Sequence, residues 1–201
     1  MLGELCGVLP PDARSILELG CGTGALTLLI AERYQAGHLT IVDGAGEMTE
    51  IARARLRRAH PTSADNATFI TSSFEELRLQ RAAYDLITSS MALHHVFDKL
   101  PFYASLRAAL RPGGRLMFAD ELVVTDAEIQ ERYWQWWLEF ARSPGHLTEA
   151  EIEDCIGHMN AYDRYETLPR QLELLTNAGF AEVDCVWRFL NYGVFVARSP
   201  A

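Results

Sequence analysis

The chain has 201 residues, 49% of them hydrophobic, which is enough for one domain with a substantial core. Its formal net charge of −9 is spread along the sequence, and this argues against a nucleic-acid partner bound through Lys and Arg contacts to phosphates. The four cysteines have no C-x-x-C spacing and no signal peptide or long apolar run occurs, so we expect free thiols, a cytoplasmic location and no membrane partner.

The first predicted elements are a strand, a glycine turn and a helix. A short helical turn at residues 2–9 ends at Pro10-Pro11, and Ser15–Leu19 is predicted to be a buried strand because apolar residues dominate it. Residues 20–24 (GCGTG) form a turn with bare backbone, followed by a predicted helix at Ala25–Arg33. Backbone N–H groups at the start of that helix can face a ligand, so the turn is a candidate binding site.

The glycine pattern is ambiguous when taken alone. Gly20, Gly22 and Ala25 also satisfy the dinucleotide pattern G-x-G-x-x-G/A, and glycines can serve only to make a turn. However, the next predicted strand, Leu39–Asp43, places an acidic residue about 20 positions on, at a strand's carboxyl end. The carboxylate of Asp43 can accept both hydroxyls of a ribose, which favours a cofactor cradle.

Strands and helices continue to alternate, as is typical of a parallel sheet with helices on both faces. Helices are expected at Glu47–Ala59 and Leu100–Leu110, and strands at Thr68–Thr71, Tyr84–Thr88 and Arg115–Glu121. The first of these helices carries four arginines interleaved with glutamates, which indicates a solvated face rather than an RNA-binding patch. These arginines are Arg53, Arg55, Arg57 and Arg58.

The regular alternation stops after Glu121. A long aromatic helix is expected at Asp126–Phe140, with rings pointing in several directions, so more than one of its faces should be covered. Thr148–Glu151 has the capping-box pattern of another helix start, and a last helix is expected at Leu168–Ala178. Two final strands, Val183–Phe189 and Gly193–Ala197, are predicted to form an antiparallel hairpin at the sheet edge.

Together these segments resemble the class I S-adenosylmethionine-dependent methyltransferase family. The matching motifs are ILELGCGTGAL, TIVDGAGEM, YDLITSSMALHHV, LRPGGRLMFADE and LLTNAGFAEVDCVWRFLNYGVFVA, in the family's order over nearly the whole chain. The resemblance implies one α/β domain over 1–201 with a Rossmann-like, mostly parallel seven-stranded sheet of order 3-2-1-4-5-7-6. It also implies an antiparallel C-terminal hairpin and a helical insertion after strand 5, at about 123–168.

The same resemblance implies S-adenosylmethionine as cofactor, with S-adenosylhomocysteine as product. It places Gly20, Gly22 and Gly24 along the methionyl part, Glu18 near the ammonium group and Asp43 at the ribose. The implied adenine contacts are Met48 and the pair Ser73-Phe74, which replaces the family's usual Asp followed by a small residue. The remaining implied cofactor contacts, from the same motifs, are Cys21, Gly44, Ser89 and Ser90.

A narrower similarity, to carboxy-S-adenosylmethionine synthase, lies in the second half of the chain. It covers GHLTEAEI, YETLPRQLELLTNAGF and the ending at Trp187–Ala197. That enzyme makes a carboxylated cofactor for tRNA modification and needs a basic residue after its E-I pair. Here Glu151-Ile152 is followed by Glu153-Asp154, and an acidic pair should repel a carboxylate. We therefore expect a sibling methyltransferase.

Methyl transfer from a sulfonium requires mainly that the acceptor be aligned and water excluded. A general base helps when the acceptor begins protonated, and the candidates are His94, His95, Asp120 and Glu121, after strands four and five. One of the two histidines is expected to pack at a helix start, and the two acids could instead cap the next helix. No metal is expected, because adjacent histidines should not close on one ion.

The insertion at 123–168 is predicted to form the wall and lid of a small-molecule acceptor site, because its rings can exclude water. Those rings could instead fill the core or form a contact in a homodimer. Three other functions stay open. They are an enzyme that modifies the cofactor or tRNA like the synthase above, an NAD-binding oxidoreductase, and a non-catalytic partner. The oxidoreductase is weakened because 201 residues leave no separate catalytic domain.

Overall fold

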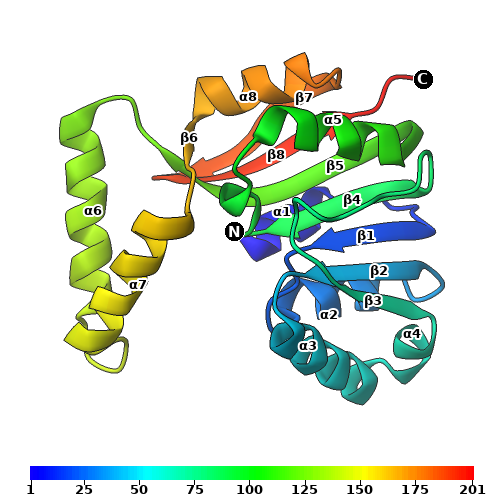
Figure 1. The fold of residues 1–201 in the computed structure, drawn as a ribbon, viewed down its shortest axis with the longest axis horizontal. Coiled ribbons are helices and arrows are strands. Elements are labelled where there is room, and N and C mark those ends of the chain that lie inside the picture. Colours follow the sequence, from blue (N-terminus) through cyan, green and yellow to red (C-terminus); the bar gives the residue numbers. More distant parts are fainter.

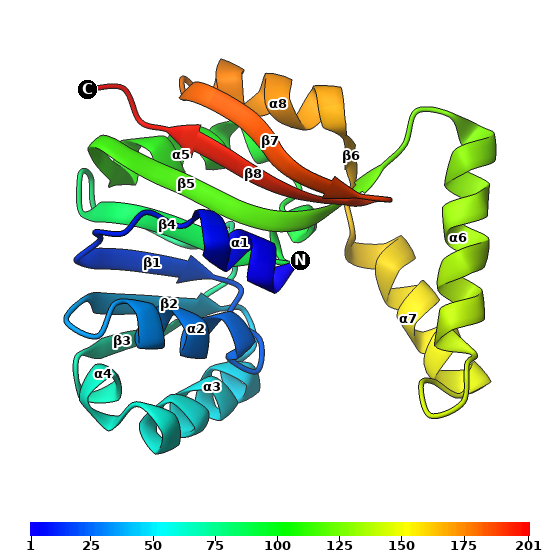
Figure 2. The same cartoon turned by 180° about the vertical axis from the view of Figure 1, so that it is seen from behind.

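The strands of this protein form one sheet with helices on both faces, as the computed structural model of residues 1–201 shows (Figures 1 and 2). Seven strands follow the order β3-β2-β1-β4-β5-β8-β7, and the two-residue strand β6 pairs with β5 outside this path. Neighbouring strands are parallel except at β5–β8 and β8–β7. With β6 set aside, the order is the predicted 3-2-1-4-5-7-6, and the predicted C-terminal hairpin is confirmed.

Most expected elements occur within one or two residues of their predicted bounds. The strands are β1 (Ser15–Leu19), β2 (His38–Asp43), β3 (Ala67–Thr71), β4 (Tyr84–Ser90), β5 (Leu110–Val123), β6 (Glu166–Thr167), β7 (Ala181–Phe189) and β8 (Tyr192–Arg198). The helices are α1 (Leu2–Val8), α2 (Ala25–Arg33), α3 (Gly46–Ala59), α4 (Pro61–Asp65), the 3₁₀ turn η1 (Leu93–His95), α5 (Lys99–Ala109), α6 (Ala127–Ala141), α7 (Glu149–Tyr162) and α8 (Leu168–Asn177). None of the helices has the length and apolar character that crossing a membrane requires.

Each face of the sheet has its own hydrophobic core, because side chains alternate along a strand. On one face, α1, α2 and α3 pack against Ile16, Ile41 and Leu86. On the other face, α5 and α8 pack against Leu17 and Phe118. The glycine turn therefore sits between two fixed layers.

Two elements differ from their predictions. Strand β5 begins at Leu110, which was expected to end the preceding helix, because Leu110 pairs with Tyr84 before the register shifts. Helix α6 was expected to be covered on more than one face, and this is wrong. Trp136 is 50% exposed and Phe140 62% exposed. The reason is that α6 and α7 form an arm that stands away from the sheet, so no other layer packs on its outer side (Figures 1 and 2).

The carboxyl ends of the central strands meet at one edge of the sheet. Leu19, at the end of β1, pairs with Val42 of β2 and with Ser89 of β4. Strand order reverses between β1 and β4, which is where ligands bind in open α/β sheets. The residues after β1, β2 and β4 are therefore brought together there.

Candidate functional site

The three glycines of the turn after β1 have left-handed backbone, with φ of +67° at Gly20, +49° at Gly22 and +86° at Gly24. A Cβ at Gly20 would lie 2.2 Å from the Cβ of Ala92, and one at Gly24 would lie 3.1 Å from Ala52. A Cβ at Gly22 would meet no atom within 4 Å. Packing thus requires the outer two glycines, while the middle one leaves bare backbone facing open space.

Asp43 ends β2 and holds this turn in place. Its Oδ2 accepts the N–H of Gly22 at 2.7 Å, and its Oδ1 accepts the N–H of Ala45 at 2.9 Å. Beside it lies a cavity of about 360 Å³ that six predicted cofactor residues line: Gly20, Gly22, Asp43, Gly44, Ser73 and Phe74. The turn and the acid therefore form one preorganised unit at the switch point of the sheet.

The cavity also has lining residues that the sequence did not indicate. They are Ser72, Glu75, Met91 and Ala92, while His95, predicted to be catalytic, lines it as well. Met91 has φ of +55°, a strained conformation for a residue with a side chain. Its N–H donates to Ala119 O at 2.9 Å, which fixes the strained residue at the end of β4.

Glu18 lies buried beside the turn, 2% exposed. Its Oε2 accepts the hydroxyl of Thr27 at 2.6 Å, but its Oε1 has no hydrogen-bond partner. Burial raises the pKa of Glu18 to about 8. A buried carboxyl oxygen without a partner suits a ligand ammonium group, which is the contact expected of Glu18 with the cofactor's methionyl part.

The other predicted cofactor residues lie behind or beside the cavity. Cys21 is buried, and Met48 is half-buried on the first turn of α3. Ser89 is fully buried, and its hydroxyl donates to Leu19 O at 2.8 Å. It therefore holds the end of β1, from which the glycine turn begins. Ser90 is half-buried at the end of β4.

The two histidines lie in one polar cluster with two aspartates. His94 Nδ1 lies 2.5 Å from Asp120 Oδ1, and both side chains are 7% exposed. Burial alone would lower the pKa of His94, but the hydrogen bond and charge of Asp120 raise it overall. His95 Nδ1 faces Asp163 Oδ1 at 2.9 Å, and neither atom makes a hydrogen bond. Burial lowers the pKa of His95.

Asp163 comes from the segment that returns from the arm, and several contacts fix it. The Tyr165 hydroxyl donates to Asp163 Oδ2, and the Arg164 N–H donates to His94 O at 2.8 Å. Buried Lys99 donates from Nζ to Arg164 O. Beyond these contacts, β6 pairs with the end of β5. No sequence motif indicated Asp163, because its position depends on a pairing between distant segments.

The expectation that adjacent histidines would not converge is wrong. The η1 turn places their ring centroids 4.2 Å apart, and both rings face Asp163. One potential ligand atom from each of His94, His95 and Asp163 lies within 4.8 Å of the others. The absence of a metal from the reaction stays a prediction.

A second cavity of about 470 Å³ lies between the arm and the end of β5. It is lined by Glu121, Val123, Gln130, Tyr133, Trp134, Trp137, Ile156, Met159, Asn160, Asp163, Tyr165 and Asn191. Burial raises the pKa of Glu121 to about 7, and Asn191 donates to its Oε1 at 2.5 Å. This cavity adjoins the first where His95 meets Asp163.

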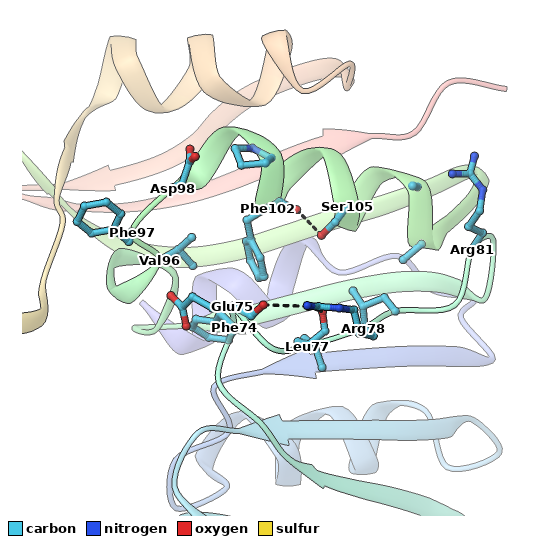
Figure 3. Close-up of a pocket in the computed structure, with 14 residues that line it drawn as sticks. Phe74, Glu75, Leu77, Arg78, Arg81, Val96, Phe97, Asp98, Phe102 and Ser105 are labelled. Atoms are coloured by element: carbon cyan, nitrogen blue, oxygen red, sulfur yellow. Dashed lines mark hydrogen bonds between the residues drawn. The ribbon is translucent and has the colours of Figure 1, made fainter.

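The largest hollow, about 630 Å³, is a groove between residues 74–81 and α5 (Figure 3). Phe74 and Glu75 line both this groove and the cavity at the glycine turn. Figure 3 shows Phe74 and Phe102 on facing sides of the groove. None of the four candidate bases lines it. The chemistry of the site therefore lies in the two smaller cavities.

Residues 16–114 match the model of a family described as a methyltransferase domain. The chain is 24% identical over 196 residues to a carboxy-S-adenosyl-L-methionine synthase of Shewanella loihica, covering 98% of this chain and 80% of that protein. An S-adenosylmethionine-dependent methyltransferase of Mesorhizobium loti has a similar structure, with a TM-score of 0.71 and 22% identity over 98% and 96% of the two chains. A phosphoethanolamine N-methyltransferase 2 of Haemonchus contortus, solved with S-adenosyl-L-methionine, aligns with a TM-score of 0.70 and 14% identity over 96% of this chain and 50% of that one.

Proposed function

We propose that this protein, an S-adenosylmethionine-dependent methyltransferase by its fold and family, methylates a small molecule held between the sheet and the arm. The observation that carries this proposal is that the two cavities meet. The first holds the glycine turn and Asp43, the second holds rings and acids, and His95 and Asp163 face each other across 2.9 Å where they adjoin. An acceptor in the second cavity would lie next to the cofactor.

Particular side chains would hold the cofactor. Glu18 would pair with its ammonium group, Asp43 would accept the ribose hydroxyls, and the backbone of Gly20 and Gly22 would follow the methionyl chain. Met48 and Phe74 would flank the adenine. S-adenosylmethionine supplies a methyl group that is already activated on a sulfonium sulfur, so the protein itself need only align the acceptor and manage a proton.

Glu121, His94 and His95 are the groups that could move this proton. Glu121 lines the second cavity, between the arm and the end of β5, which we call the acceptor cavity. Its pKa of about 7 suits a general base at neutral pH. His95 lines the cofactor cavity, while buried His94 is held by Asp120. We therefore assign the base role to Glu121 or His95 and give His94 a positioning role.

The arm, within the predicted insertion at 123–168, would act as wall and lid of the acceptor site. Its helices carry Tyr133, Trp134 and Trp137 on the cavity side, and its outer side is exposed. An arm that packs on the sheet only near its base can move without disturbing either core. The exposed Trp136 and Phe140 would equally suit a homodimer contact, which stays a prediction.

A second candidate, synthesis of a carboxylated cofactor, is favoured by the 24% identity to the Shewanella protein. The acidic pair Glu153-Asp154 does not bear on this choice, because both residues are exposed on α7 and line neither cavity. The acceptor cavity instead presents Glu121 and Asp163, and no Lys or Arg lines it. Two acids there disfavour a carboxylate ligand.

The four cysteines are free, which supports the proposed cytoplasmic location. The net charge of −9 supports a small-molecule partner over nucleic acid.

Calorimetry and mass spectrometry test the function. Titration with S-adenosylmethionine should give saturable heat, whereas NADH should give none. Native mass spectrometry of the purified protein should reveal small ligands, and incubation with them should yield S-adenosylhomocysteine and a product heavier by one methylene unit. A cofactor recovered with an added carboxylate would favour the synthase reaction, and absence of cofactor binding would refute both.

A further inference from the structure

The acceptor cavity combines aromatic rings with carboxylates and has no basic side chain. The rings belong to Tyr133, Trp134, Trp137 and Tyr165, and the acids are Glu121 and Asp163. No Lys, Arg or His lines the cavity. Ring faces attract cations, and carboxylates attract them further, whereas both repel anions. The lining therefore selects by charge as well as by shape.

Of the two acids, Glu121 keeps a carboxylate oxygen for a ligand, whereas Asp163 is engaged by neighbouring side chains. The Asp163 side chain is 4% exposed, its Oδ2 accepts from Tyr165, and its Oδ1 lies 2.9 Å from His95 Nδ1. Glu121 is engaged at one oxygen by Asn191. The other oxygen of Glu121, Oε2, accepts no hydrogen bond from the protein, and a ligand N–H would satisfy it.

Three of the four rings, those of Tyr133, Trp134 and Trp137, belong to α6. Trp134 and Trp137 stack on each other along α6, with centroids 5.0 Å apart and an interplanar angle of 14°. Tyr165 follows α7 and donates its hydroxyl to Asp163. The cavity therefore presents ring faces from α6 next to carboxylates from the end of β5 and the segment after α7.

We infer that the methyl acceptor is a basic amine, which enters this cavity as an ammonium ion between the α6 rings and the carboxylates of Glu121 and Asp163. This inference rests on the proposed methyl transfer and specifies its substrate class. A neutral alcohol or phenol would leave the charge of Glu121 uncompensated, and a carboxylate or phosphate would be repelled by both acids.

The chemistry of the step balances with the residues present. The ammonium ion gives one proton to the Glu121 carboxylate, which frees the nitrogen lone pair. That lone pair forms the bond to the methyl carbon while the carbon–sulfur electron pair stays on sulfur, as a neutral thioether. The methylated amine leaves as a cation, and Glu121 returns its proton to solvent. A pKa of Glu121 near 7 suits this exchange.

A pair of probes with matched shape tests the charge preference directly. Choline carries a permanent positive charge, and 3,3-dimethylbutan-1-ol has the same shape with carbon in place of nitrogen. Binding of each is followed through tryptophan fluorescence. We expect choline to bind at least about tenfold more tightly than the alcohol, because cation–π and carboxylate contacts act only on the charged probe.

Variants locate the binding. Glu121→Gln should weaken choline about tenfold and leave the alcohol unchanged, because only one charge is lost. Trp137→Leu should weaken both probes, choline more strongly. Glu139→Gln removes an exposed glutamate from the same helix, lines no cavity, and should bind both probes as wild type does. Thermal unfolding identifies any misfolded variant, and Glu121→Gln carries the test if Trp137→Leu does not fold.

Equal affinities for the two probes, or no binding of choline, would overturn the inference. So would an unchanged choline affinity in Glu121→Gln. Turnover separates this failure from failure of the proposed function. Primary and secondary amines should yield S-adenosylhomocysteine, whereas matched alcohols and carboxylic acids should not. Turnover of an alcohol or acid alone would refute an amine acceptor and leave the proposed methyl transfer intact. Absence of S-adenosylmethionine binding would refute both the amine acceptor and the methyl transfer.

Discussion

Replacing Glu18 by glutamine should make the free protein more stable above neutral pH while it weakens cofactor binding. Glu18 is 2% exposed, and its Oε1 lacks a partner. Burial holds the pKa of this carboxyl at about 8, so the folded protein keeps a proton that the unfolded chain releases. Glutamine keeps the oxygen that accepts from Thr27 and never ionises.

The magnitude follows from the shift of the pKa. Below pH 4.5 Glu18 is protonated in both the folded and the unfolded chain, so its ionisation does not change the free energy of unfolding. As the pH rises, the unfolded state ionises first, so the free energy of unfolding falls by ~1.4 kcal/mol per pH unit. This fall ends at about pH 8, where the folded carboxyl also ionises. The wild type loses about 5 kcal/mol over this window, about 3 of them by pH 7, and Glu18→Gln loses none from this site.

Urea unfolding between pH 5 and pH 9 measures the difference. The stability of Glu18→Gln minus that of wild type should grow steadily up to about pH 8 and then level off. Glu32→Gln, at an exposed position on α2, is the control and should follow the wild type. Parallel curves for Glu18→Gln and wild type would show that Glu18 is already ionised in the free protein, and would refute the reasoning.

Cofactor binding gives the second half of the test. At pH 7, pairing with an ammonium group requires the proton of Glu18 to leave, so calorimetry in buffers of different ionisation enthalpy should reveal a released proton. Glu18→Gln should bind more weakly and release none. Equal proton release in both proteins would move the ammonium contact to another residue.

Three further predictions address the turn, the acid and the arm. Gly20→Ala should lower the free energy of unfolding by about 2–5 kcal/mol, since its Cβ would overlap Ala92 in a left-handed backbone. Gly22→Ala should lower it by only about 1–2 kcal/mol, and its Cβ should block cofactor binding. Thermal unfolding and calorimetry separate these effects, and normal binding by Gly22→Ala would make the turn purely structural. Asp43→Ala should weaken S-adenosylmethionine at least ~100-fold in calorimetry, because two charge-assisted hydrogen bonds are lost, and equal affinity would remove Asp43 from the site. Amides of α6 should exchange quickly in the free protein and become protected with cofactor, and full protection without cofactor would refute a lid.

The residues that line the cavity at the glycine turn could largely be brought together from the sequence because their determinants are local. The glycine turn lies between one strand and one helix, and Asp43 ends the very next strand, so chain order alone brings them together. The sheet order followed from the resemblance of the whole motif series. Element bounds were close because strong apolar periodicity, a capping box at Thr148 and the glycine at 179 mark them.

The acceptor half was less predictable because its determinants are far apart in the chain. Asp163 and Tyr165 reach the histidines only through the pairing of β6 with β5 and the contacts of Lys99. The aromatic helix was expected to be covered because its rings point in several directions, but periodicity does not show whether a neighbouring layer exists. The acidic pair at 153–154 was assigned an effect on the ligand that its exposed position does not allow.

The arm leaves the sheet and returns to it at one point. Val123, where β5 ends, pairs with Thr167, where the returning chain resumes the fold. A segment whose two ends are already adjacent can be exchanged for one of another length without shifting any strand. The rings that the arm contributes to the cavity can therefore be exchanged, by evolution or by design, while Glu121, Asn191 and the glycine turn stay in place.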